Sequence, residues 1–198
     1  MLEANDNRYA NWDRCSVKIQ TYIKVKRNRW LTKPLLAGRY SKWLNDTGSL
    51  TNRLKAISSD FQVKLVNKAN STASFEELSK LGCKHNQKAY VRDVFLISRG
   101  LPVVFAHSVL PYSSIKGPWF RLKRLGNKPL GEVLFSDPRV SRTALTFKKL
   151  NCRDILHEKA VESLPNLPKF LWARRSVFKL NGSCILVNEI FLNEILTQ

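Results

Sequence analysis

The chain has 198 residues, of which 43% are hydrophobic and 25% are charged, so it can form one domain with a real core and has the composition of an ordinary soluble globular protein. Its net charge of +19 predicts attraction to anions but does not choose among nucleic acid, an acidic membrane surface and a small anionic metabolite. No apolar run reaches the roughly 20 residues of a membrane helix, and the acidic start MLEAND is unlike a secretory signal. We therefore expect a reduced protein of the cytoplasm.

Residues 1–29 predict a basic N-terminal arm that is partly flexible. The stretch 16–25 alternates weakly, so it could form a strand or lie over the body of the protein. The basic side chains around it favour a solvated surface over a nucleic-acid-binding arm, because Trp30 is a single aromatic stacking partner. The remaining residues, 30–198, are expected to form one domain, since they contain no internal repeat, low-complexity tract or linker.

The first half of this domain predicts short helices and one strand. Residues 39–45 look helical, and Ser49 is a suitable N-cap for a helix over 50–57. The free backbone N–H groups at the start of such a helix suit a carboxylate or phosphate, although most capped helices bind no anion. A strand over 61–66 and a helix within 74–82 follow.

A hairpin is predicted from strands over 90–98 and 103–110, with a turn between them. By parity, Arg92 lies on a mainly apolar strand face together with Val94 and Leu96. A buried arginine stays charged, and its fork matches a carboxylate through two parallel hydrogen bonds. The sequence leaves open whether that carboxylate belongs to a ligand or to a neighbouring strand.

The second half of the domain continues the mixture of helices and strands. Residues 113–126 form a loop that passes into a basic amphipathic helix, and 129–135 form a short helix or turn in which Gly131 permits close backbone approach. A strand is predicted over 140–150, and a polar connection with some helical character over 151–170. Sequentially adjacent strands with interspersed helices favour an α+β fold with one antiparallel sheet.

The last hairpin, within 172–192, has the clearest signal in the chain. Asn181-Gly182 supplies the positive φ angles of a tight turn between two apolar strands. Counting by twos places Glu189 on one strand face with Val187 and Phe191. A carboxylate there must find a cation or a hydrogen-bond donor. In one alternative, Glu189 forms a salt bridge with a neighbouring strand or lies at an edge in water. In the other, it is held in a cavity for acid–base or ligand-orienting work.

Residues that commonly ligate metals are spread along the chain without ligand spacing. The cysteines, which form no C-x-x-C pair or disulfide scaffold, are Cys15, Cys83, Cys152 and Cys184. The histidines are equally dispersed, and His107 alternates with apolar residues like a satisfied core or rim histidine. Motifs of serine nucleophiles, P-loops and dinucleotide sites are absent. We therefore expect no metal site.

Six blocks, in order, resemble the bacterial chorismate lyase family. They are residues 43–54 (WLNDTGSLTNRL), 91–96 (VRDVFL), 105–111 (FAHSVLP), 125–135 (LGNKPLGEVLF), 172–176 (WARRS) and 187–192 (VNEIFL). The resemblance runs from about Trp30 to Leu192. It implies an oxo-acid lyase of ubiquinone biosynthesis that removes pyruvate from chorismate and leaves 4-hydroxybenzoate, without metal or organic cofactor. It also implies a six-stranded antiparallel sheet with helical flaps over a buried site.

The resemblance assigns roles to four residues. Arg92 would hold the ring carboxylate, assisted by the backbone N–H of Leu50. Glu189 would meet the 4-hydroxyl group of substrate and product, with the backbone N–H of Leu130 as the second contact. Arg92 and Glu189 are therefore the expected catalytic residues.

Arg174 and Arg175 are the remaining candidates for the substrate's second carboxylate, although structural pairing with the sheet is the alternative. Three features depart from the family pattern. Ala173 replaces a usual glycine, the connection 151–170 is longer than expected, and residues 1–29 contain no motif to align. The long connection is either an added lid or a surface insertion.

Two other functions are compatible with parts of the sequence. A fold of this type also forms the ligand-sensing domain of some transcription regulators, so a non-catalytic sensor of a small anionic or aromatic ligand is the first alternative. A nucleic-acid-binding protein is the second, because of the positive charge. The lyase hypothesis instead predicts a monomer that binds chorismate, 4-hydroxybenzoate and pyruvate, without a nucleic-acid partner or an integral membrane segment.

Overall fold

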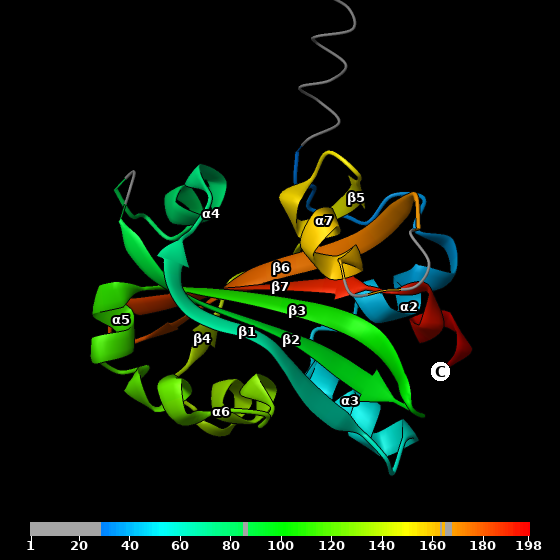
Figure 1. Cartoon of the computed structure of the whole chain (residues 1–198), viewed down its shortest axis with the longest axis horizontal. Helices are drawn as coiled ribbons and strands as arrows, with labels where there is room; N and C mark the ends of the chain where they lie inside the picture. Colours follow the sequence, from blue (N-terminus) through cyan, green and yellow to red (C-terminus); the bar gives the residue numbers. More distant parts are fainter. Residues whose placement is uncertain (1–28, 85–86, 163, 165–167) are drawn as a thin grey trace, which may run out of the picture.

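The computed structural model describes residues 29–84, 87–162, 164 and 168–198 (Figure 1). The predictions for residues 1–28, including the weak strand at 16–25, lie outside these residues. Among those described, no helix combines the length and the apolar content needed to cross a membrane.

One antiparallel sheet organises the described part of the chain. Its strands are β1 (Gln62–Thr72), β2 (Lys88–Ser98), β3 (Leu101–Pro111), β4 (Ser141–Arg142), β5 (Thr146–Asn151), β6 (Phe170–Leu180) and β7 (Ser183–Phe191). The order is β1-β2-β3-β7-β6-β4, and β5 also pairs with β6. The α+β class with an antiparallel sheet is confirmed.

The described sheet has seven strands where six were expected. The predicted strand over 140–150 is divided into β4 and β5, which pair with successive parts of the same edge of β6. At the break, the backbone N–H of Thr143 donates to Val177 O, and the Val177 N–H donates to the Thr143 hydroxyl oxygen. The hydroxyl replaces a backbone acceptor there, so the ladder is interrupted between the two short strands.

Two tight turns set the register of the central strands. Asn181 and Gly182 have φ angles of 47° and 76°, which confirms the predicted turn between β6 and β7. Arg99 and Gly100 have φ angles of 50° and 72°, so the turn between β2 and β3 is shorter than predicted. Leu101 already belongs to β3.

Short helices cover both faces of the sheet. The helical segments are η1 (Gly38–Tyr40), α2 (Ser41–Leu44), α3 (Leu50–Ile57), α4 (Phe75–Lys80), α5 (Tyr112–Lys116), η2 (Phe120–Arg124), α6 (Leu130–Ser136), α7 (Ile155–Val161) and η3 (Asn193–Thr197). In Figure 1, α3 and α6 lie on one side of the sheet, here called the first face, and α4 and α7 lie on the other, the second face.

Serine side chains cap the N-termini of α3 and α4. The Ser49 side chain accepts a hydrogen bond from Asn52 N–H, so α3 begins where the sequence places it. Ser74 and Glu77 form a capping box at the start of α4. Leu44 and Leu54, from α2 and α3, are fully buried against the first face. Helices therefore cover the apolar side chains on both faces of the sheet.

A buried charged cluster joins α4 to the second face. His107 is 1% exposed; its Nε2 lies 2.9 Å from Glu77 Oε1, and its Nδ1 lies 2.5 Å from Asp93 Oδ1. Burial opposes the charge on His107, but its hydrogen bonds to Asp93 and Glu77 raise its pKa above 6.5. Burial alone would raise the pKa of Glu77, but the contacts with His107 and Ser74 lower it to about 2. The expectation of a satisfied core histidine is confirmed.

This cluster predicts a maximum in stability between pH 4.5 and 6.5. The contribution of Glu77 is complete above its unfolded pKa of 4.5 and is lost as the pH falls towards about 2. The contribution of protonated His107 is complete below 6.5 and is lost as the pH rises through its higher folded pKa. Urea unfolding at a series of pH values measures both effects.

His107→Gln should lower the free energy of unfolding by about 3 kcal/mol near pH 6, because it leaves two buried carboxylates without their cation. The variant should also lose the decline in stability above pH 6.5. His157→Gln is the matched control, since His157 is buried but contacts Pro168 O instead of a carboxylate. An unchanged alkaline decline in His107→Gln would contradict the assignment.

Candidate active site

A cavity of about 50 Å³ lies between the first face of the sheet and the helices α3 and α6. Its wall is mainly apolar and includes Val94, Leu134 and Phe178. By this measure a single water needs roughly 10–15 Å³, so the cavity has room for about three to five water molecules. The charged side chains that line it are those of Arg92, Arg142 and Glu189.

Arg92 reaches the cavity from β2 and is 3% exposed. Its Nη2 donates to Gly126 O and to Lys128 O, both at 2.9 Å, which ties β2 to the loop before α6. Its buried Nε has no partner. Burial lowers the pKa of Arg92, yet a guanidinium stays charged at physiological pH. The side chain therefore presents a fixed cation with an unused donor.

Glu189 enters the cavity from β7, and a buried ion pair holds it. The Nε of Arg174, opposite Glu189 on β6, lies 2.5 Å from Glu189 Oε2. The Nη2 of Arg142 lies 3.8 Å from the same oxygen. Within the described residues, the ion pairs of this carboxylate therefore gather at Oε2. Glu189 thus pairs with a strand neighbour, as the first alternative states, and also lines a cavity, where acid–base or ligand-orienting work stays a prediction.

Arg142 is a site residue that the sequence prediction did not include. It belongs to the two-residue strand β4, where its Nε donates to Ser176 Oγ at 2.8 Å and its Nη1 donates to Thr47 O at 2.9 Å. Its guanidinium also lies 5.0 Å from the centre of the Phe178 ring. Burial lowers the pKa of Arg142 below its ordinary value, and the nearby Glu189 carboxylate opposes this shift only in part. No motif marked this arginine, because the interruption between β4 and β5 follows from tertiary contacts.

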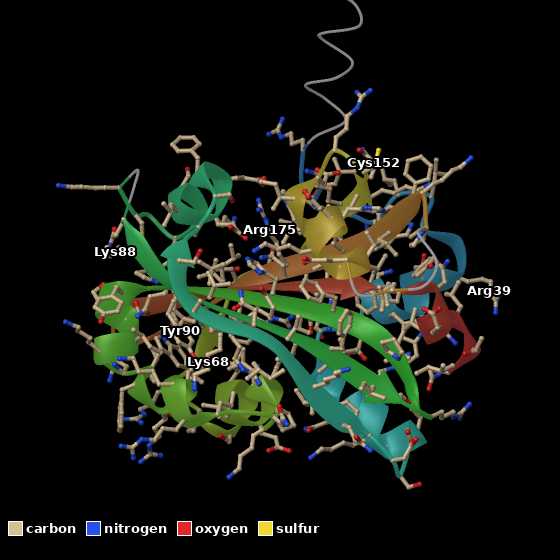
Figure 2. The ribbon with its side chains drawn as sticks, viewed as in Figure 1. Arg39, Lys68, Lys88, Tyr90, Cys152 and Arg175 are labelled. Atoms are coloured by element: carbon tan, nitrogen blue, oxygen red, sulfur yellow. The ribbon has the colours of Figure 1, made fainter. Side chains whose placement is uncertain are left out.

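Arg174 and Arg175 do not have the positions expected for contacts to a second carboxylate. Arg174 is fully buried behind Glu189, and its Nη1 donates to the carbonyl oxygens of Trp43 and Asp46. Arg175 points to the second face, where its Nη1 donates to Glu76 Oε1 at 2.7 Å (Figure 2). The structure therefore assigns both to pairing. The two-residue turn could have shown this from the sequence, since it sets Arg174 opposite Glu189.

The N-termini of α3 and α6 meet at the cavity. Leu50 and Leu130 are the first residues of these helices and line the cavity, so their backbone N–H groups lack intrahelical acceptors. A Cβ atom on Gly131 would lie 2.9 Å from Thr51 Oγ1 and 3.2 Å from Ser49 Oγ. The expected close backbone approach at Gly131 is therefore confirmed, and it brings the two helix ends together.

Comparison with known proteins places this chain in a family. The family model described as chorismate lyase matches residues 27–198. The chain belongs to the chorismate lyase family. The probable chorismate pyruvate-lyase of Methylobacillus flagellatus is 42% identical over 170 residues, which cover 86% of this chain and 96% of that protein. The probable chorismate pyruvate-lyase of Thiobacillus denitrificans is 43% identical over 169 residues, or 85% and 90% of the two chains.

Solved structures at low sequence identity share the fold of this family member. The effector domain of PhnF from Mycobacterium smegmatis has a TM-score of 0.52 and 16% identity, and covers 74% of this chain and 90% of its own. A GntR-family transcriptional regulator from Bacillus cereus has a TM-score of 0.51 and 15% identity, with coverage of 68% and 93%. At these identities the likeness concerns the fold alone.

Gly131→Ala should lower the free energy of unfolding by about 1–3 kcal/mol, because the new methyl group overpacks the contact between α3 and α6. Chemical denaturation measures this loss. Thr51→Ala removes the nearest atom, so the double variant should recover part of the stability, and a double-mutant cycle gives the coupling. Strictly additive effects of the two substitutions would contradict this account of the contact.

Proposed function

We propose that the protein is a chorismate pyruvate-lyase, which eliminates pyruvate from chorismate and leaves 4-hydroxybenzoate. The observation that carries this proposal is that Arg92 and Glu189, remote in sequence, line one small and mainly apolar cavity. Membership of the chorismate lyase family supports the same activity. We place the reaction in ubiquinone biosynthesis and in the cytoplasm, with a monomeric enzyme that needs neither a cofactor nor a nucleic-acid partner.

The two ends of the cavity suit the two ends of the aromatic product. Arg92 offers its unused Nε to the ring carboxylate, and the N–H of Leu50 supplies a second donor. At the other end, Glu189 Oε1 accepts a hydrogen bond from the 4-hydroxyl group. The N–H of Leu130 donates to the oxygen of that hydroxyl. The apolar wall excludes water between these ends and strengthens each polar contact.

The elimination breaks the bond between C3 and the ether oxygen, and C4 loses its proton as the ring becomes aromatic. The leaving enolpyruvyl group takes up one proton and becomes pyruvate, so no electrons are exchanged with a cofactor. The ion pair with Arg174 holds Glu189 in place in the cavity wall. Glu189 orients the 4-hydroxyl group and stands where it can relay the C4 proton. A positioned acid or base of this kind contributes about 10²–10⁴-fold to the rate.

Arg142 supplies the cation for the second carboxylate of chorismate. The substrate is a dianion, whereas the ring carboxylate occupies only Arg92. Arg142 is the other cationic side chain of the cavity wall, and its anchors on Ser176 and Thr47 fix its position. This role replaces the earlier expectation for Arg174 and Arg175, whose guanidinium groups have other partners.

The purified protein should convert chorismate into 4-hydroxybenzoate and pyruvate, which absorbance of the aromatic product measures. Arg92→Ala should raise KM about 10- to 100-fold, because it removes charge-assisted hydrogen bonds. Glu189→Ala should lower kcat about 10²–10⁴-fold. Arg139→Ala is the control, since Arg139 is exposed and pairs with Asp137 outside the cavity wall.

Absence of conversion above the buffer rate would contradict the lyase proposal. In that case, binding of 4-hydroxybenzoate without turnover would favour the non-catalytic sensor, in line with the fold shared with transcriptional regulators. Retardation of random duplex DNA by the protein in a gel-shift assay at physiological salt would instead favour a nucleic-acid partner.

Arg142→Met should raise KM for chorismate about tenfold, because the second carboxylate loses its charged partner. Binding of 4-hydroxybenzoate should change little, since that product has one carboxylate and contacts Arg92. Arg142→Lys keeps the charge, so its KM for chorismate should lie between those of the unchanged protein and Arg142→Met. Titration calorimetry with the product, beside steady-state kinetics with the substrate, separates these effects. If the variant weakened the binding of chorismate and of 4-hydroxybenzoate equally, Arg142 would serve only to hold Glu189 and would not contact the second carboxylate.

A further inference from the structure

A second cavity, of about 350 Å³, lies on the opposite face of the sheet. Its floor is formed by the central strands, and its sides come from α4, from α7 and from the chain before α7. Figure 2 shows Arg175 on this side, between α4 and α7. The proposed lyase reaction uses no residue of this cavity, so its polar groups need a separate explanation.

The floor contains a buried donor and a buried acceptor without partners. Asn188 is fully buried; its Nδ2 donates to His107 O at 3.4 Å, and its Oδ1 has no partner. Arg175 is 8% exposed; its Nη1 donates to Glu76, and its Nε has no partner. The two residues are cross-strand neighbours on β6 and β7. Buried polar atoms are normally satisfied, so this pair is suited to a group that both accepts and donates.

The remaining charges around the cavity favour an anionic ligand. Lys148 lies 2.7 Å from Asp154, and His107 is held between two carboxylates, so these charges are compensated. Arg153 and Lys159 also line the cavity, and no carboxylate within the described residues forms an ion pair with either. The Arg175 guanidinium stacks on the Trp30 ring, 4.1 Å from its centre, which fixes the direction of its Nε.

The wall on the α7 side comes from the connection over residues 151–170. Arg153, Asp154, Ile155, Leu156 and Lys159, all in the 151–170 connection, line the cavity. Whether this connection is an added lid or a surface insertion stays a prediction, but its described residues form one wall of the second cavity.

We propose that the second cavity binds a small hydroxy-carboxylate, with its carboxylate on Arg175 Nε and its hydroxyl donating to Asn188 Oδ1. The carboxylate accepts from a charged donor, and the adjacent hydroxyl satisfies the neighbouring amide oxygen. Arg153 and Lys159 at the rim accommodate a further carboxylate. The proposal is independent of the lyase activity, because the first cavity lies across the sheet.

Titration calorimetry of the full-length protein with L-malate and with succinate tests the site. The two dicarboxylates differ by one hydroxyl group, which is the group assigned to Asn188. Saturable binding of malate at one site is expected, with succinate bound about tenfold more weakly. Absence of saturable malate binding in the millimolar range, equal affinity for the two, or saturation by inorganic phosphate alone would overturn the proposal.

Variants on each face identify the cavity that binds malate. Arg175→Met should weaken malate binding about tenfold or more, whereas Arg92→Met in the first cavity should leave it unchanged. If Arg175→Met does not fold, Lys159→Met at the rim provides the same test with a smaller expected loss. Binding lost in Arg92→Met and kept in the second-face variants would place malate in the first cavity and overturn the proposal.

Discussion

The buried ion pair between Arg174 and Glu189 is the interaction on which the site depends. Arg174 is fully buried, so its charge needs partners inside the protein, although its Nη2 has none among the described residues. Its Nε donates to the Glu189 carboxylate, and its Nη1 donates to the carbonyl oxygens of Trp43 and Asp46. One side chain therefore fixes the acid of the cavity and also the segment that leads into α3. Removing it would leave a partly buried carboxylate and unpaired carbonyl groups together.

The sheet separates two polar centres that share the same strands. Arg174 and Arg175 are adjacent in β6, yet they point to opposite faces, as do Asn188 and Glu189 in β7. Apolar clusters surround each polar centre on its own face. A strand thus contributes a charged group to each side without bringing the two charges together. The first face concentrates its polar groups in a small cavity, and the second in a wider one.

The shared fold does not determine what such a cavity does. Regulators with TM-scores just above 0.5 have the same sheet architecture, at identities of 15–16%. The residues that define chemistry here are a cation with an unused donor, an anchored carboxylate and two helix ends held together at Gly131. Function is therefore argued from these groups, and the fold supplies the frame that aligns them.

Local rules were sufficient for most of the elements and for the strand faces on which Arg92 and Glu189 lie. The Asn181-Gly182 turn, the Ser49 cap and the alternation of the strands depend on near neighbours in the chain, and all are present. Only the tertiary structure decided the role of Arg142, because β4 is two residues long and is held by a side-chain acceptor on a neighbouring strand. The second cavity likewise required α4, α7 and the sheet to meet, which periodicity within one segment cannot encode.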